Sequence, residues 1–322
     1  MRDKRCRHSR RPPERTDLPN LVICHYSTAT VNPTWIKVLR HSGLRGKHFA
    51  PLAKPLRKLS RVNLLPKGIS RWIPVDETFR VTFGSNESFS YSLSGAWPDG
   101  YGRALYWHGI AACEPETITV FLDQVRGARF FLDIGSHTGI YTLLACARNP
   151  HLRVFAFEPV PEVQTALIRN LDINGFTVRC SVRPEALSDH CGTAQFHVPV
   201  SRDMASLDPR GFLGLPGRLI EVDVCTVDSL IERGTVVDLI KIDVEGFEDA
   251  VLRGMNRVLE ESRPRIIFEC LTQNAANKVN RLLGDAYTFY RLGRHGTEQI
   301  TYISPNISSG YRNFLAVPRR TT

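Results

Sequence analysis

The sequence predicts a doubly wound α/β domain with a mostly parallel sheet, preceded by an N-terminal extension. Two observations support this fold class. From residue 130 onward, short apolar strands alternate with helical segments of about 10 to 15 residues. The apolar strands are continuous runs, which is typical of parallel strands that are covered on both faces.

The individual elements follow from local patterns. Residues 79–93 alternate apolar and polar side chains around the turn residues 84–86, which predicts a β-hairpin. Pro115 suits the first turn of a helix over 115–125. We then expect strands at 130–132, 153–157, 177–183, 193–198, 238–242 and 265–268, helices at 139–148, 161–173, 227–232 and 246–260, and a closing strand pair at 287–292 and 313–317.

The basic charge of the chain is confined to its N-terminal part. The 322 residues carry a formal net charge of +10, yet residues 1–78 alone carry +12 and the remainder −2. We interpret 1–20 as a disordered basic tail, 21–100 as an extension that contains the hairpin, and 101–322 as the main domain. A basic arm can attract nucleic acid, but a solvated tail is the commoner explanation.

Composition and cysteine spacing exclude several protein classes. No apolar run approaches the roughly 18 residues of a membrane span. The N-terminus lacks the apolar stretch of a secretory signal. The eight cysteines are dispersed and form no C-x-x-C pair, unlike those of zinc sites or small disulfide scaffolds. We therefore expect a cytoplasmic protein with reduced cysteines.

A ligand site is predicted where the first two strands end. The segment 133–139 (DIGSHTG) leaves a strand at an acid, passes two glycines and enters a helix, and ligands of open α/β sheets bind beyond the carboxyl ends of strands. Its G-x-x-x-G spacing differs from the G-x-G-x-x-G of dinucleotide folds. Glu158 ends the second strand, where an acid can accept both ribose hydroxyls of an adenosine.

S-adenosylmethionine (SAM) suits this pair of motifs, because it carries an adenosine, no phosphate and an α-amino group. A plain strand-to-helix turn is the structural alternative for the loop, and His137 could equally be a packed or hydrated histidine. We predict that the cofactor is SAM and that the residues binding it are Asp133, Gly135, Ser136, His137, Thr138, Gly139 and Glu158.

A second group of charged residues lies in the segment 239–245 (LIKIDVE). Lys241 and Asp243 share one face of a strand, and a charged lysine in an apolar strand needs a partner. Asp243 is the expected partner. Glu245 follows in the turn before the next helix. A structural ion pair with helix-capping acids is one interpretation of this group.

The other interpretation is catalytic. Methyl transfer needs alignment of the reacting groups and removal of a hydroxyl proton. We predict that Asp243 is the general base or orients the substrate, that Glu245 is the second candidate, and that Lys241 tunes Asp243. Glu269 ends the next strand and adds a third carboxylate. Three acids could bind Mg²⁺, but we predict no metal because nothing in the sequence fixes their geometry.

Several segments between residues 130 and 270, among them FLDIGSHTGIYTLLA, VFAFEPVPEV, LIKIDVEGFEDAVLRGM and RPRIIFE, resemble the FkbM family of SAM-dependent methyltransferases. The resemblance implies a Rossmann-like domain of the class I methyltransferase type over 101–322. It also implies O-methylation of a hydroxyl on a small molecule, a sugar or a natural product. It adds Ser188 and Asp189 as a segment near the adenine, and the chain departs from the family at 136–137, where Ala-Asn is usual.

Two other functions stay open. The basic residues 1–78 could belong to a nucleic-acid-binding protein or an RNA methyltransferase. Nucleic acid is the less favoured partner, because the chain shows no N-P-P-Y-type motif and the arm lacks interleaved aromatic residues. The third possibility is a SAM-fold protein that serves as an interaction module without catalysis.

Overall fold

The computed structural model describes residues 53–61, 75–84, 86–93, 99–199, 216–293, 296–306 and 312–319, all of them within one compact unit, Arg45–Thr322. The predicted tail, 1–20, and part of the predicted extension lie outside the described residues. The described part of the extension consists of helix α2 (Ala53–Arg61) and a hairpin of strands β1 (Glu77–Phe83) and β2 (Glu87–Leu93). The two strands pair antiparallel, so the predicted hairpin is confirmed.

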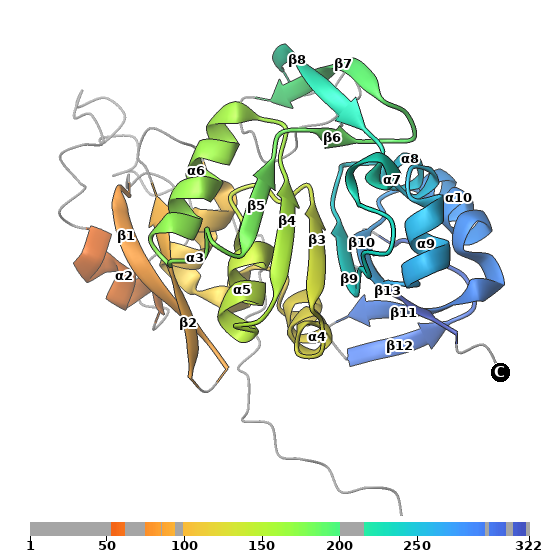
Figure 1. Ribbon diagram of the computed structural model, residues 1–322. Helices are drawn as coiled ribbons and strands as arrows, with labels where there is room; N and C mark the ends of the chain where they lie inside the picture. Colours follow the sequence, from red (N-terminus) through yellow and green to blue (C-terminus); the bar gives the residue numbers. More distant parts are fainter. Residues whose placement is uncertain are drawn as a thin grey trace, which may run out of the picture. The chain divides into compact units, whose positions relative to one another are not determined.

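The main domain is organised around one eight-stranded sheet. Five strands are parallel neighbours: β10 (Arg265–Glu269), β9 (Leu239–Ile242), β3 (Phe130–Ile134), β4 (Arg153–Phe157) and β5 (Cys180–Arg183). Three antiparallel strands complete it: β13 (Asn313–Pro318), β11 (Tyr287–Gly293) and β12 (Gly296–Ile300). The order is β12-β11-β13-β10-β9-β3-β4-β5 (Figure 1). The predicted mostly parallel sheet is confirmed.

The order of the strands reverses between β3 and β9. The chain moves outward from β3 through β4 to β5 and later returns to β9 on the other side of β3. Connections from such a pair diverge to opposite sides, which opens a crevice at the carboxyl ends of the strands. The predicted cofactor loop follows β3, and the Lys241 segment forms β9.

Helices cover both faces of the sheet. On one face α4 (Pro115–Val125), α5 (Ile140–Arg148) and α6 (Pro161–Asp172) share a core with alternate strand residues such as Phe131. The β1–β2 hairpin joins this core from outside. On the opposite face, Phe130 and Leu132 lie in a second core with α8 (Glu248–Arg253), α9 (Asn256–Ser262) and α10 (Gln273–Leu283). Side chains that alternate between two apolar cores explain the continuous apolar strands.

The predicted single helix over 246–260 is wrong, because the chain breaks there into α8 and α9. The carbonyl of Gly254 accepts the backbone amide of Asp228 at 3.0 Å. The Asp228 carboxylate accepts two backbone amides at the start of α9, at 2.8 and 3.1 Å. A Cβ on Gly254 would lie 2.0 Å from the Ser188 carbonyl oxygen. A tertiary cap and a close backbone contact therefore end one helix and begin another.

The elements α3 (Gly100–His108), β6 (Ala186–Leu187) and β8 (Gly217–Cys225) were not predicted from the sequence, whereas β7 (Gly192–Pro199) and α7 (Val227–Leu230) correspond to the predicted strand over 193–198 and the predicted helix over 227–232. A small sheet in the order β6-β8-β7 packs on its own apolar cluster at the upper edge of Figure 1. In its longest strand, β8, Ile220, Val222 and Val224 face this cluster and alternate with the exposed Glu221 and Asp223. The short helices η3 (Ile110–Ala112) and η5 (Gly284–Ala286) complete the described elements.

The described residues bear on two predictions, the one on membrane-spanning helices and the one on reduced cysteines. None of the helices there has the length and apolar character that a membrane crossing requires. The described cysteines, which are Cys113, Cys146, Cys180, Cys191, Cys225 and Cys270, are free thiols.

Candidate active site

The loop between β3 and α5 has an uncommon backbone conformation. Gly135, His137 and Gly139 have φ angles of 79°, 49° and 91°, in the left-handed region that favours glycine. The Gly135 amide donates to the carbonyl of Phe157 at 3.1 Å. A Cβ on Gly135 would lie 1.9 Å from the carbonyl oxygen of Asp243. Only a glycine at this position lets the loop pass between the ends of β4 and β9.

Glu158 is tied to this loop. Its Oε2 accepts the backbone amide of His137 at 3.0 Å, and its Oε1 accepts the amide of Val160 at 2.9 Å. The residue is 6% exposed. Burial raises the pKa of its carboxyl, and this effect outweighs His137 and the two amides, which lower the pKa. A carboxylate has about four acceptor positions, so two remain for hydroxyl groups of a ligand.

A cavity opens at the ends of β3, β4 and β9, and it encloses about 770 Å³ when the open solvent at its mouth is included. Its lining combines apolar side chains and carboxylates with Tyr101 and with Gly135 and His137 of the loop. The apolar residues are Ile134, Phe157, Pro159, Ala186, Leu187, Phe196 and Val244, and the acids are Glu158, Glu185, Asp243 and Glu245. A flat apolar ring with a hydroxylated, positively charged extension would match this combination.

A smaller cavity of about 430 Å³ adjoins the first. Both cavities are lined by Tyr101, Gly135, His137 and Asp243. The smaller one continues along the loop to the start of α5, where its other lining residues are Cys113, Glu114, Ile118, Ser136, Thr138, Ile140 and Tyr141. A single elongated ligand could therefore occupy parts of both cavities.

Lys241 and Asp243 form the expected ion pair. Lys241 Nζ lies 2.9 Å from Asp243 Oδ2, and the lysine side chain is 1% exposed. Nζ also lies 4.9 Å from the ring centroid of Tyr141, a cation–π distance. Burial lowers the pKa of Lys241, but the charges of Asp243, Glu114 and Glu269 outweigh it and the pKa is raised. Lys241 therefore stays charged and holds Asp243, which lines both cavities.

Three carboxylates converge beside this pair. One oxygen each of Asp243, Glu245 and Glu269 lies within 4.8 Å of the others. Burial, and then the charge of Asp243, raise the pKa of Glu245 to about 8. The same two causes raise the pKa of Glu269, although Arg312 Nε lies 2.9 Å from its Oε1 and opposes the shift. The oxygens could reach one cation, but Lys241 and Arg312 already neutralise two of the acids.

Not all predicted loop residues line the cavities. Asp133 is buried below the loop, where its Oδ2 accepts the Thr142 hydroxyl at 2.6 Å. The pKa of Asp133 is raised to about 6, because burial raises it more than Thr142 and Lys241 lower it. A Cβ on Gly139 would lie 2.3 Å from Leu167 Cδ1, so this glycine permits tight packing of α5, as expected. Asp133 and Gly139 line neither cavity, whereas Ser136 and Thr138 line the smaller one.

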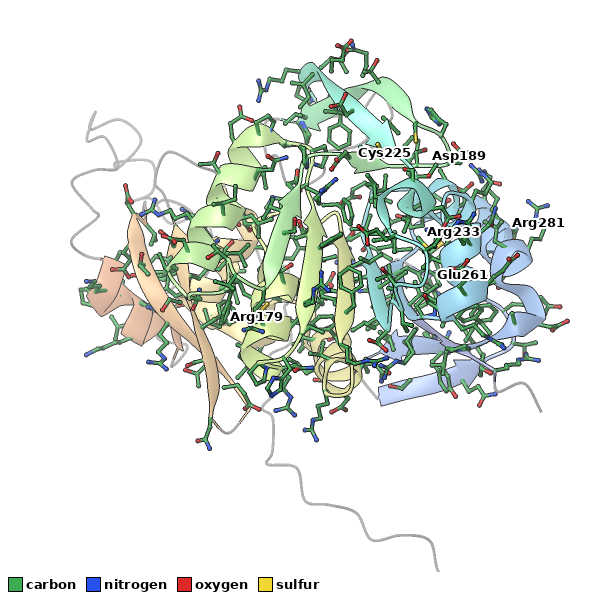
Figure 2. The ribbon with its side chains drawn as sticks, viewed as in Figure 1. Arg179, Asp189, Cys225, Arg233, Glu261 and Arg281 are labelled. Atoms are coloured by element: carbon green, nitrogen blue, oxygen red, sulfur yellow. The ribbon has the colours of Figure 1, made fainter. Side chains whose placement is uncertain are left out.

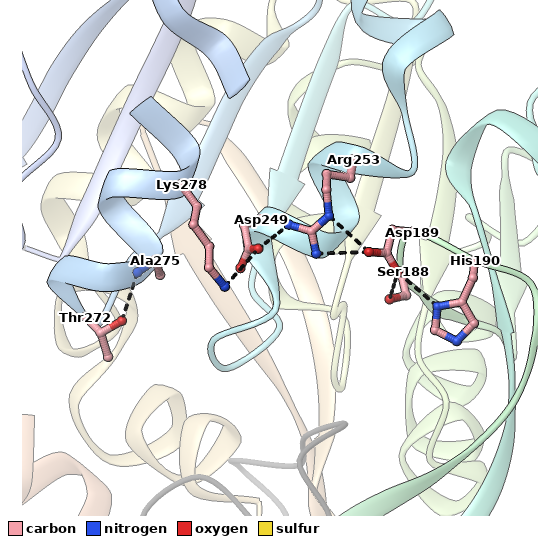
Figure 3. Close-up of polar contacts among 8 residues, drawn as sticks. All are labelled: Ser188, Asp189, His190, Asp249, Arg253, Thr272, Ala275 and Lys278. Atoms are coloured by element: carbon pink, nitrogen blue, oxygen red, sulfur yellow. Dashed lines mark hydrogen bonds and ion pairs between the residues drawn. The ribbon is translucent and has the colours of Figure 1, made fainter. Parts of the chain in front are cut away.

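Ser188 and Asp189 also line neither cavity, although the residues just before them do. Asp189 Oδ2 pairs with Arg253 at 2.9 Å, and Arg253 pairs in turn with Asp249 (Figure 3). Lys278 Nζ lies 3.2 Å from the other side of Asp249. Figure 2 places Asp189 beside Cys225 at the small sheet, where the Ser188 amide donates to the Cys225 carbonyl at 2.9 Å. These contacts hold Ser188 and Asp189, which follow the cavity-lining residues Ala186 and Leu187, against α8 and, through Asp249, connect α8 to α10.

Three site residues, Tyr101, Glu114 and Arg312, were not predicted. Tyr101 comes from the unpredicted helix α3 and lines both cavities. Glu114 precedes α4, and its Oε1 lies 3.6 Å from an Arg312 nitrogen. Arg312 also pairs with Glu269, so it connects the start of α4 to the end of β10. No local pattern signals such a contact, because the partners are far apart in the sequence.

Comparison with known proteins finds similarity over the part of the chain that contains the loop and the Lys241 segment. Residues 133–298 match the family described as the methyltransferase FkbM domain. The chain is 29% identical over 177 residues to the hexuronic acid methyltransferase AglP of Haloferax volcanii, an alignment that covers 54% of this chain and 69% of that protein. It is 30% identical over 159 residues to the 31-O-demethyl-FK506 methyltransferase FkbM of Streptomyces tacrolimicus, covering 41% of this chain and 61% of that protein.

A solved structure, the FkbM methyltransferase of Methylobacillus flagellatus, is also similar. It aligns with a TM-score of 0.41 at 17% identity, over 59% of this chain and 43% of that one. The family match begins at Asp133 and ends in β12. It therefore contains the loop, Glu158 and the Lys241 segment, and it excludes Tyr101, Glu114 and Arg312.

Proposed function

Because the chain belongs to the FkbM methyltransferase family, we propose that it transfers the methyl group of SAM to a hydroxyl group on a sugar or another small molecule. One observation carries this proposal. The Glu158 carboxylate binds the His137 amide of the cofactor loop and lines the larger cavity at the same time. The ribose of an adenosine lying over the loop after β3 would contact Glu158. In nucleotide-binding folds of this type, an acid at the end of the second strand accepts ribose hydroxyls.

The lining residues fit SAM in shape and charge. Phe157, Leu187 and Phe196 can enclose the adenine, and Glu158 can accept the ribose hydroxyls. Gly135 and Asp243 line both cavities and are the residues that would border the sulfonium. Bound there, SAM supplies an activated methyl group on a good leaving group. The acids of the cavity wall attract this cation before methyl transfer.

We assign the role of general base to Asp243. Its carboxylate lies at the junction of the two cavities, and it takes the proton that the acceptor hydroxyl loses. Lys241 fixes its orientation through the 2.9 Å contact to Oδ2. Glu245 lines the larger cavity and retains a proton near neutral pH, since its pKa is about 8. It can therefore donate a hydrogen bond to an acceptor oxygen.

The relatives support the acceptor class. One is named for a hexuronic acid and the other for an O-demethylated compound, so both names agree with an oxygen-bearing acceptor. A polyanionic acceptor such as RNA is less compatible with the cavity, because four carboxylates line it and would repel phosphate groups. The basic segment on which that alternative depends lies largely outside the described residues.

Two measurements test the proposal. Calorimetry should detect binding of SAM and S-adenosylhomocysteine, and labelled SAM should transfer its methyl group to members of a panel of hydroxylated sugars and natural products. Asp243→Asn should retain cofactor binding but lose about 100-fold or more of the transfer rate. Asp223→Asn, an exposed acid of β8, is the matched control and should be fully active. Absence of cofactor binding in the wild type, or full activity of Asp243→Asn, contradicts the proposal.

A further inference from the structure

Glu114 is held against the smaller cavity by contacts that fix its carboxylate. Its backbone is left-handed, with φ 43° and ψ 57°, immediately before Pro115 at the start of α4. A left-handed conformation is costly for a residue with a long side chain and persists where its surroundings enforce it. The Tyr141 hydroxyl donates to Oε2 at 2.9 Å. The side chain is 14% exposed, and the residue lines the smaller cavity.

The cation nearest to Glu114 is engaged more closely elsewhere. Arg312 lies 3.6 Å from Glu114 Oε1 but 2.9 Å from Glu269 Oε1. Lys241 is committed to Asp243. Glu114 therefore presents a carboxylate to the cavity that can still accept a hydrogen bond from a cationic donor.

The lining of the smaller cavity also includes a helix start, which favours an anion. Helix α5 begins there, and its N-cap, Gly139, supplies no side-chain cap. Ile140 and Tyr141 of its first turn line the cavity. The Asp133 carboxylate accepts the Thr142 amide of this turn, and the positive end of the helix dipole at Ile140 and Tyr141 attracts negative charge. A cavity lined by both an acid and a helix start matches a zwitterion, such as the α-amino acid group of SAM.

The two cavities share four lining residues, Tyr101, Gly135, His137 and Asp243, so one ligand can extend from the larger cavity into the smaller one. We propose that the aminoacyl end of the cofactor lies in the smaller cavity and that Glu114 binds its α-ammonium group. This inference rests on the proposed function. Glu114 lies outside the family match, 133–298, so the shared family pattern does not assign it this role.

The test compares two ligands that differ only in the amino group. Calorimetry measures the dissociation constants of S-adenosylhomocysteine and of its analogue in which hydrogen replaces the α-amino group. We expect the wild type to bind S-adenosylhomocysteine about 10- to 100-fold more tightly, as for a charge-assisted hydrogen bond. In Glu114→Gln this preference should fall to below about threefold.

Two variants serve as controls. Glu158→Gln should weaken both ligands and leave the preference unchanged, because it removes a ribose contact. Glu116→Gln, in the first turn of the same helix, should change neither constant. If Glu114→Gln does not fold, Glu114→Asp replaces it. Aspartate keeps the charge but is shorter by one methylene, so the preference for the ligand with the amino group should also fall.

The remaining outcomes are decisive. A wild type without preference, or a preference that persists in the Glu114 variants, overturns the inference. So does a preference that is lost in Asp243→Asn and kept in Glu114→Gln, because the ammonium would then bind Asp243. Failure of the wild type to bind either ligand instead contradicts the proposed function itself, and the inference falls with it.

Discussion

Replacing Lys241 with methionine should destabilise the protein by about 3 kcal/mol. Removing one partner of a buried ion pair costs about 3 to 5 kcal/mol, because the other charge is left uncompensated. Lys241 is 1% exposed, so solvent screens it little, whereas Asp243 is 26% exposed and can regain some hydration. The value should therefore lie near the lower limit. Asp133 adds to the cost, since it lies opposite Lys241 in the β3–β9 register.

The assay is urea unfolding at pH 7, with Lys278→Met as the matched control. Lys278 Nζ lies 3.2 Å from the buried Asp249 Oδ2, but the lysine side chain is 40% exposed and Asp249 keeps Arg253 as a second partner. Loss of Lys278 should therefore cost about 0 to 1 kcal/mol. Because the pKa of Lys241 is raised, its contribution should persist through neutral pH and disappear only above the ordinary pKa of lysine. Equal losses in the two variants would refute the reasoning.

Two other substitutions test the loop and the acid cluster. Gly135→Ala should abolish S-adenosylhomocysteine binding in calorimetry, because its Cβ would lie 1.9 Å from the Asp243 carbonyl oxygen. Gly127→Ala is the control and should bind normally, because its Cβ would meet nothing within 4 Å. The pKa of Glu245 is about 8 in the folded protein, so the fold keeps a proton that the unfolded chain loses above the ordinary pKa of glutamate. The free energy of unfolding should therefore fall as pH rises from about 4.5 to 8. Glu245→Gln should remove this part of the slope, and an identical slope in the variant would argue against a buried, protonated Glu245.

The parts of the fold that the sequence predicts are those with strong local signals. The predicted helix over 115–125 and the strand over 153–157 coincide with α4 and β4, because Pro115 and a compact apolar run mark their bounds. The loop from β3 to α5 was recognisable from its two glycines, and the structure shows why each is needed. Periodicity and special backbone positions are local properties, so one sequence is enough to read them.

The rest depends on contacts between distant segments. The break between α8 and α9 is imposed by Asp228, which no feature of the 246–260 pattern reveals. The partners of Glu114, namely Tyr141 and Arg312, come from α5 and from the residue before β13. Burial also decides the protonation of Glu245, and composition alone does not report it. Predicting these features would require tertiary structure or covariation among relatives.

Tyr101 and Arg312 lie on either side of the matched segment, 133–298; Tyr101 lines both cavities, and Arg312 pairs with Glu269. A transplant of residues 133–298 alone into another protein would therefore carry the loop and Glu158 but lose the contacts of Tyr101, Glu114 and Arg312. Sequence variation over 101–118 could then alter the lining of both cavities without any change in the loop.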